Sequence, residues 1–167
     1  GQKRKGTETP YIVHPVGVAM LLAQAGCRPE VVAAGLLHDT IEDCGVTASQ
    51  LASEFGAEVA DIVVGCSEPE RHLPWEERKA HTFTYLRSAP LEIKLVACAD
   101  KLNNVRAMRN DLAAHGEAFW KRFKRGRDQQ AWYYRGLVEA FRPEIQAGTC
   151  APLFAALEHE VTALFGG

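Results

Sequence analysis

No stretch of this 167-residue sequence is apolar for long enough to cross a bilayer, and its first residues lack the apolar core of a secretory signal. Charge of one sign is not in excess either, because the formal net charge is only −2. These absences argue against a membrane protein and against a general attraction to nucleic acid or acidic membranes. No repeat, low-complexity tract or linker divides the chain, so we expect one domain over residues 1–167.

Cysteines are few, and they show no CxxC pair. An odd number of scattered cysteines is typical of reduced thiols in a cytosolic protein, not of a disulfide framework or a thiolate zinc site. We therefore expect a cytoplasmic protein with free thiols. The five cysteines are Cys27, Cys44, Cys66, Cys98 and Cys150.

Alternating β-branched runs are scarce, whereas apolar residues recur at helical spacing along most of the chain. Proline and glycine mark several of the expected helix ends. The predicted helices cover residues 15–25, 29–44, 47–55, 57–66, 75–88, 91–110, 130–145 and 153–165. The sequence therefore predicts an all-α helical bundle.

Four polar groups close the second of these helices, in the stretch LLHDTIED over residues 36–43. His38 and Asp39 continue rows of aliphatic residues, whereas Glu42 and Asp43 lie one turn further on. For Glu42 or Asp43 alone, a solvated helix end is the simpler interpretation. His38 and Asp39 fit it poorly, because a polar group that is buried needs a partner.

A second apolar row is interrupted in the helix over residues 91–110, where Asp100 and Asn104 stand among aliphatic side chains. Burying a carboxylate costs several kcal/mol unless it is paired. Asp100 therefore needs either a metal ion or a cation such as Lys101 or Arg106, and this helix alone leaves both explanations open.

His14 lies just before the proline that opens the first helix, where a histidine is more often a core residue than a ligand. Taken together, His14, His38, Asp39 and Asp100 form a mixed nitrogen and oxygen set. That set suits Mn²⁺, Fe²⁺ or Zn²⁺ and contains too much imidazole for a typical Mg²⁺ or Ca²⁺ site. Four protein ligands on a metal that prefers six leave positions for water and substrate, which indicates a catalytic site.

Four ordered stretches, RKGTETPYIVHP, LLHDTIED, WEERK and ADKLNNVR, resemble the HD-domain metal phosphohydrolases. They are most similar to the (p)ppGpp hydrolase domain of the Rel/SpoT type and its stand-alone small alarmone hydrolase relatives. The resemblance covers residues 4–106 and implies an all-α HD fold with one Mn²⁺, or another divalent transition metal. The metal ligands that it implies are His14, His38, Asp39 and Asp100. The catalytic pair that it implies is Glu42 and Asp43, and the substrate-binding residues are Arg4, Lys5, Asn104 and Tyr133.

The resemblance also implies the reaction, which is hydrolysis of the 3′-pyrophosphate of (p)ppGpp to give pyrophosphate and GDP or GTP. Glu42 and Asp43 are expected to orient water and move protons, while Arg4 and Lys5 neutralise phosphate charge. The expected partner is a small nucleotide, with no nucleic acid and no membrane, and the sequence leaves a homo-oligomer open. Hydrolysis of (p)ppApp or another nucleotide stays an alternative, and so does a non-catalytic nucleotide-binding regulatory domain.

The family normally has a helix before the RKG segment, and we expect that helix to be missing here. The sequence has no GxxxxGK phosphate loop, and we expect a hydrolase without a synthetase domain. For two basic segments, a solvated helix surface is the first interpretation and a phosphate contact is the second. They are FWKRFKRGR over residues 119–127, for which a nucleic-acid patch is the weaker interpretation, and Arg78 with Lys79 in WEERK.

Overall fold

The computed structural model describes residues 1–4, 6–68, 72–148 and 150–166. Within these ranges the chain forms helices, with one isolated bridge between Lys3 and Pro10. The α-helices are α1 (Val13–Gln24), α2 (Pro29–Leu37), α3 (Thr40–Cys44), α4 (Ala48–Phe55), α5 (Ala57–Cys66), α6 (Trp75–Ser88), α7 (Leu91–His115), α8 (Arg127–Ala140), α9 (Arg142–Gln146) and α10 (Ala151–Phe165), and a 3₁₀-helix, η1, spans Gly116–Arg122. The all-α prediction is confirmed, and none of the described helices is both long and apolar enough to span a membrane.

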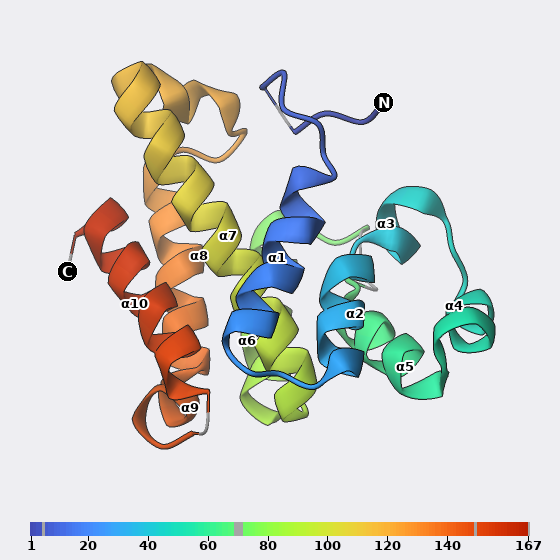
Figure 1. Ribbon diagram of the computed structural model, residues 1–167. Coiled ribbons are helices and arrows are strands. Elements are labelled where there is room, and N and C mark those ends of the chain that lie inside the picture. Colours follow the sequence, from blue (N-terminus) through green and yellow to red (C-terminus); the bar gives the residue numbers. More distant parts are fainter. Residues whose placement is uncertain (5, 69–71, 149, 167) are drawn as a thin grey trace.

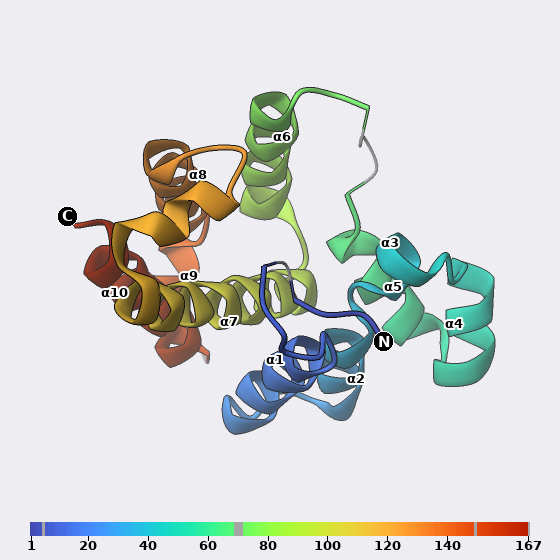
Figure 2. The same ribbon diagram turned by 90° about the horizontal axis from the view of Figure 1, so that it is seen from above.

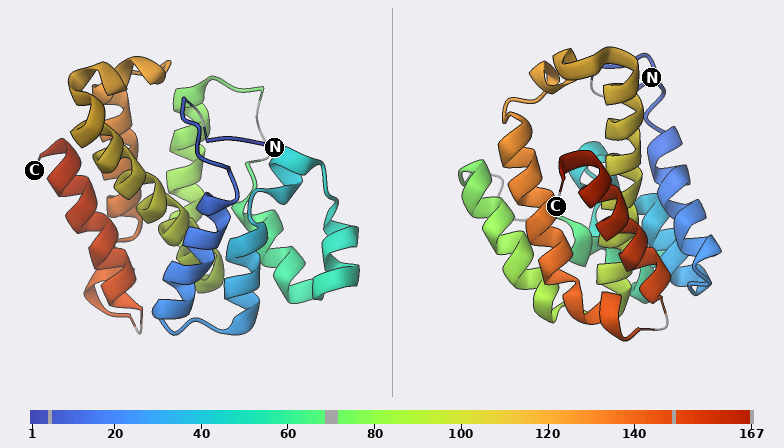
Figure 3. Two further views of the ribbon diagram at one scale, coloured as in Figure 1. Left: turned by 45° about the horizontal axis from the view of Figure 1, so that its top comes forward. Right: turned by 90° about the vertical axis from the view of Figure 1, so that its left-hand side faces the viewer.

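Helix α7 runs through the centre of the molecule, and α1, α2, α5 and α10 pack against it (Figure 1). Seen from above, α1 and α2 lie on one side of α7, whereas α6 and α8 lie on the other (Figure 2). Figure 3 shows the C-terminal helices at the end of the molecule opposite α4 and α5. Helix α7 therefore lies between the pair α1 and α2 and the pair α6 and α8, with residues that face each pair.

Local sequence explains most helix boundaries. Thr47 and Gln50 form a reciprocal capping box at the start of α4. Gly56 separates α4 from α5 with φ +91°, a conformation that L side chains rarely adopt, and the predicted break at this glycine is confirmed. Pro74 and Pro90 precede α6 and α7, because proline fixes the extended backbone from which each helix starts.

The predicted single helix over residues 29–44 is wrong at its centre. Helix α2 ends at Leu37, and α3 begins only at Thr40. The dihedral angles of Asp39, φ −94° and ψ −3°, depart from those of a regular helix. Successive side chains of a continuous α-helix diverge by about 100°. The interruption lets His38 and Asp39 turn towards the same point instead.

Candidate metal centre

Three buried side chains from distant parts of the sequence meet beside α7. They are His14 from the first turn of α1, His38 from the junction of α2 and α3, and Asp100 from the middle of α7. One ligand atom of each lies within 4.8 Å of the other two, so the three could hold a metal ion. We call these residues together with Asp39 the His–Asp cluster.

His14 is fixed by a contact between α1 and α7. Its Nδ1 lies 2.8 Å from Oδ1 of Asn103, so Nδ1–H donates and Nε2 is left as a lone-pair nitrogen. Nε2 is directed at Oδ1 of Asp100, 3.2 Å away. Helix α1 can approach this closely because residue 17 is glycine; a Cβ there would stand 2.4 Å from Nδ2 of Asn103. Asn103 is a positioning residue that sequence reasoning missed.

His38 is oriented by its own helix. Nδ1–H donates to the carbonyl oxygen of Gly35 at 2.8 Å, which directs Nε2 into the cluster. Nε2 is buried, lies 3.1 Å from Oδ2 of Asp39, and makes no hydrogen bond with any residue in the described part of the chain. Burial lowers the pKa of His38, but Asp39 and then Asp100 outweigh that effect and raise it to about 8. A buried nitrogen without a hydrogen bond, facing two carboxylates, is an environment that fits a cation.

Asp39 is the most exposed member of the cluster. Its Oδ2 lies 3.8 Å from Nε2 of His14 and accepts a hydrogen bond from the hydroxyl of Tyr11. Burial raises the pKa of Asp39, but the adjacent imidazole of His38 outweighs burial and holds this pKa below its usual range. Burial, followed by Asp39, raises the pKa of Tyr11 well above its ordinary value. Tyr11 was missed by sequence reasoning, and its place three residues before His14 was the only signal.

Asp100 is paired with a cation, as one of the two explanations requires, and it also lies where it could hold a metal ion. Its Oδ2 is paired with Nζ of Lys101, while Oδ1 faces the imidazoles and accepts from Nδ2 of Asn104 at 2.6 Å. Burial raises the pKa of Asp100, but the charge of Lys101, followed by the neighbouring imidazoles, outweighs burial and lowers the pKa far below its usual range. Arg106, the other proposed partner, instead pairs with Glu160 at 3.2 Å.

A large cavity of about 1100 Å³ opens beside the cluster, and His38, Asp39 and Asp100 line one part of it. Three cations line another part, namely Arg78, Lys79 and Lys101, which we call the cationic wall. The prediction of solvated surface for Arg78 and Lys79 is wrong. Their side chains are only 20% and 17% exposed, because both bind the carboxylate of Glu68 inside the cavity rim.

The two residues of the expected catalytic pair have different surroundings. Glu42 lines the large cavity, and its Oε1 accepts from the backbone N–H of Glu68 at 2.7 Å. Asp43 is exposed and accepts from Nε2 of Gln2 at 3.1 Å, without lining the cavity. Only Glu42 is therefore placed to face a molecule bound in the cavity.

The expected substrate-binding residues are divided between two cavities. Tyr133 is buried and lines the large cavity, with Nζ of Lys79 lying 5.1 Å from its ring centroid. Arg4 and Asn104 line a smaller cavity of about 260 Å³, where Nη2 of Arg4 donates to Oδ1 of Asn104 at 2.8 Å. Because Asn104 also donates to Asp100, Arg4 is connected to the cluster by hydrogen bonds. Lys5 lies outside the described residues.

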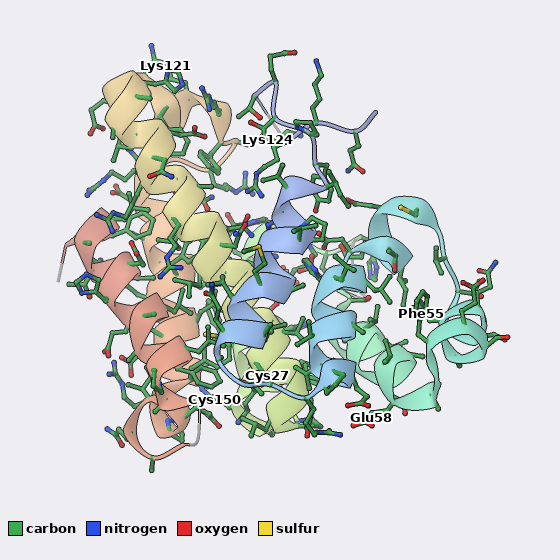
Figure 4. All side chains as sticks on the ribbon, in the orientation of Figure 1. Cys27, Phe55, Glu58, Lys121, Lys124 and Cys150 are labelled. Carbon is green, nitrogen blue, oxygen red and sulfur yellow. The ribbon has the colours of Figure 1, made fainter. Side chains whose placement is uncertain are left out.

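The basic segment over residues 119–127 is only partly a solvated surface. Lys121 and Lys124 are exposed, and Figure 4 labels both in the upper part of the molecule. Trp120 is buried in the core, however, and the segment starts as a 3₁₀-helix instead of an α-helix. Arg122 pairs with Asp111 at 3.1 Å.

The sequence of this chain matches a family model and several known proteins. Residues 1–129 match a family model described as HD domain. A Danio rerio protein named guanosine-3′,5′-bis(diphosphate) 3′-pyrophosphohydrolase MESH1 is 44% identical over 108 residues, which are 63% of this chain and 59% of that protein. A Vibrio cholerae protein named guanosine-3′,5′-bis(diphosphate) 3′-pyrophosphohydrolase is 40% identical over 114 residues, 65% of this chain and 16% of the relative. This chain therefore spans less than two thirds of the length of these relatives.

Two solved structures are similar over most of the chain. A crystal structure of a Listeria monocytogenes EGD-e protein is 40% identical with a TM-score of 0.84, covering 92% of this chain and 99% of that one. A second structure, described as a metazoan ortholog of SpoT that hydrolyses ppGpp and plays a role in starvation responses, is 28% identical with a TM-score of 0.78. It covers 97% of this chain and 85% of that one.

Proposed function

The chain belongs to the HD domain family, and we propose that it is a metal-dependent phosphohydrolase that removes the 3′-pyrophosphate of (p)ppGpp. Its products would be pyrophosphate and GDP or GTP. The observation that carries this proposal is the position of the cationic wall, which lines the same cavity as His38, Asp39 and Asp100. The names of the Danio rerio and Vibrio cholerae relatives support the choice of substrate.

The proposed ligand atoms are Nε2 of His14 and His38, together with one carboxylate oxygen each of Asp39 and Asp100. Two imidazoles and two carboxylates suit Mn²⁺ first and other divalent transition metals second. When bound, such an ion lowers the pKa of water and so provides a nucleophile near neutral pH. The buried Nε2 of His38, which lacks a hydrogen bond within the described residues, supports this assignment.

The remaining residues bind substrate and move protons in this proposal. Glu42 faces the cavity and would orient the attacking water and accept its proton, with the exposed Asp43 passing protons to solvent. The cationic wall would neutralise the departing pyrophosphate, whose charge must be balanced as the bond breaks. We also propose substrate contacts for Arg4, Lys5, Asn104 and Tyr133, in a single domain over residues 1–167 that acts in the cytoplasm.

The test is a substrate panel with the purified chain and Mn²⁺, with pyrophosphate release as the readout. The panel contains ppGpp, pppGpp, ppApp, cyclic dinucleotides and dNTPs, each with and without a chelator. We expect pyrophosphate from ppGpp and pppGpp, and no release when the metal is chelated. Turnover of ppApp alone would assign an adenine alarmone, and turnover of dNTPs or cyclic dinucleotides alone would overturn the substrate. Tight ppGpp binding without any turnover would instead identify a regulatory domain.

A further inference from the structure

Two cysteines far apart in the sequence meet at one end of the bundle. Cys27 lies in the turn between α1 and α2, and Cys150 is the residue that precedes α10. Figure 4 labels both residues next to one another, and Figures 1 and 3 show the turn after α1 passing the start of α10. Sγ of Cys150 lies 4.0 Å from the carbonyl oxygen of Ala25, two residues before Cys27. The two thiols are also close enough to influence each other electrostatically.

The two thiols of this pair are not equivalent. Burial, followed by the neighbouring Cys150, raises the pKa of Cys27 to about 11, so Cys27 keeps its proton at neutral pH. Cys150 is therefore the sulfur that attacks first, and Cys27 is the sulfur that closes the bond.

We propose that Cys27 and Cys150 are a site of reversible disulfide formation by exchange with a small-molecule disulfide such as glutathione disulfide. The thiolate of Cys150 attacks one sulfur of the small disulfide and releases one small thiolate, which leaves a mixed disulfide on Cys150. Cys27 then loses its proton to solvent and attacks the sulfur of Cys150, which releases the second small thiol. Two protein thiols are oxidised, and one small disulfide is reduced to two thiols.

The other cysteines have different surroundings. Cys98 is buried, and its Sγ lies 3.7 Å from the carbonyl oxygen of Leu153. Cys66 similarly lies 4.0 Å from the carbonyl oxygen of Ile93. Cys44 is exposed. Oxidation is therefore expected to select Cys27 and Cys150 for a bond within the chain, and Cys44 offers a matched control.

The disulfide would join two parts of the molecule that both contact α7. The hairpin of α1 and α2 carries His14 and His38 at the end opposite Cys27, about 18 Å away along the 12 residues of α1. Helix α10 packs against α7, which carries Asp100. A cross-link between residues 27 and 150 restricts the unfolded chain over a long loop, so we expect the melting temperature to rise by about 5 °C or more.

The experiment treats the full chain with glutathione disulfide, blocks the remaining thiols by alkylation, and maps the cysteines by mass spectrometry. We expect a monomer lighter by two hydrogen atoms, with Cys27 joined to Cys150, and full reversal by excess reduced thiol. The melting temperature is measured in both states. The Cys44→Ser variant should behave in the same way as the unaltered chain.

Single variants test the order of the two steps. Cys27→Ser should accumulate a mixed disulfide on Cys150, whereas Cys150→Ser should leave Cys27 free. Alkylation of both Cys27 and Cys150 after oxidation, with glutathione found only on Cys44, would overturn the proposal. Since none of these readouts uses catalytic activity, the result is independent of the proposed function.

Discussion

The two sides of the large cavity are built in different ways. The His–Asp cluster draws its members from α1, the junction of α2 and α3, and α7, and two of its four side chains are at least 95% buried. The cationic wall draws Arg78 and Lys79 from α6, a helix with little apolar character that packs mainly on α8. The cluster is held by hydrogen bonds to ring nitrogens and carboxylates, whereas Arg78 and Lys79 share the carboxylate of Glu68 among the residues that the structure describes. We therefore expect changes in the cluster to abolish function and changes in the wall to weaken it.

Asp39→Ala should have the largest effect, because it removes a member of the His–Asp cluster. We expect turnover of ppGpp to fall by about 10³-fold or more, because a ligand is lost from the metal. The side chain of Asp39 makes no capping bond to α3, so the helical circular dichroism should stay intact. Asp61→Ala removes an exposed carboxylate from α5 and is the matched control. Full activity of Asp39→Ala would rule out the proposed metal ligands.

The His38 pKa of about 8 makes metal uptake depend on pH. A histidine binds a metal through a deprotonated ring nitrogen, so metal binding has to remove the proton that His38 holds below about pH 8. Apparent Mn²⁺ affinity should therefore fall about 50-fold between pH 8 and pH 6. The folding stability of the metal-free protein changes with pH in the opposite direction. The raised pKa of His38 stabilises the fold below about pH 6.5, and this contribution is lost as pH rises through about 8. Isothermal titration in buffers of different ionisation enthalpy measures both affinity and proton release, and an affinity independent of pH would contradict the assignment.

Lys79→Ala tests the cationic wall. We expect KM for ppGpp to rise about tenfold with a smaller change in kcat, because a charge contact to phosphate is lost while the cluster stays intact. Arg87→Ala is the control, since it removes an exposed cation from the last turn of the same helix. An unchanged KM in Lys79→Ala would show that this part of the wall does not contact substrate.

Tyr11→Phe should have the smallest effect. This variant tests how much one hydrogen bond to the His–Asp cluster contributes to metal binding. The change removes the donor to Asp39 and leaves the ring in place. We expect Mn²⁺ affinity to fall about threefold to tenfold, which corresponds to the net contribution of one typical hydrogen bond, here to a partly exposed carboxylate. A metal titration measures the change, and a loss as large as that of Asp39→Ala would mean that Tyr11 does more than hold the carboxylate.

The contrast between the His–Asp cluster and the cationic wall also explains which site residues could be predicted from the sequence. His38, Asp39 and Asp100 could be predicted as members of a site because each interrupts an apolar helical row, and such interruptions are visible without coordinates. Arg78 and Lys79 could not be placed in the cavity, because charged residues on a polar helix look like surface until α6 packs on α8.

The break between α2 and α3 was missed for a related reason. Its sequence has no proline or glycine, so periodicity favours a continuous helix through His38 and Asp39. The roles of Tyr11 and Asn103 also depend on contacts between elements. No helical row within one segment reveals them.

Asp100 and Lys101 are neighbours in sequence, yet the first belongs to the His–Asp cluster and the second to the cationic wall. The spacing between this carboxylate and this cation is set by one peptide unit in the middle of α7. Arg78 and Lys79 have no such tie, because their distance from the cluster depends on how α6 is seated. Lys101 therefore lies at a fixed distance from the His–Asp cluster. In the proposed function, this distance would limit the length of the phosphate chain that the cavity accepts.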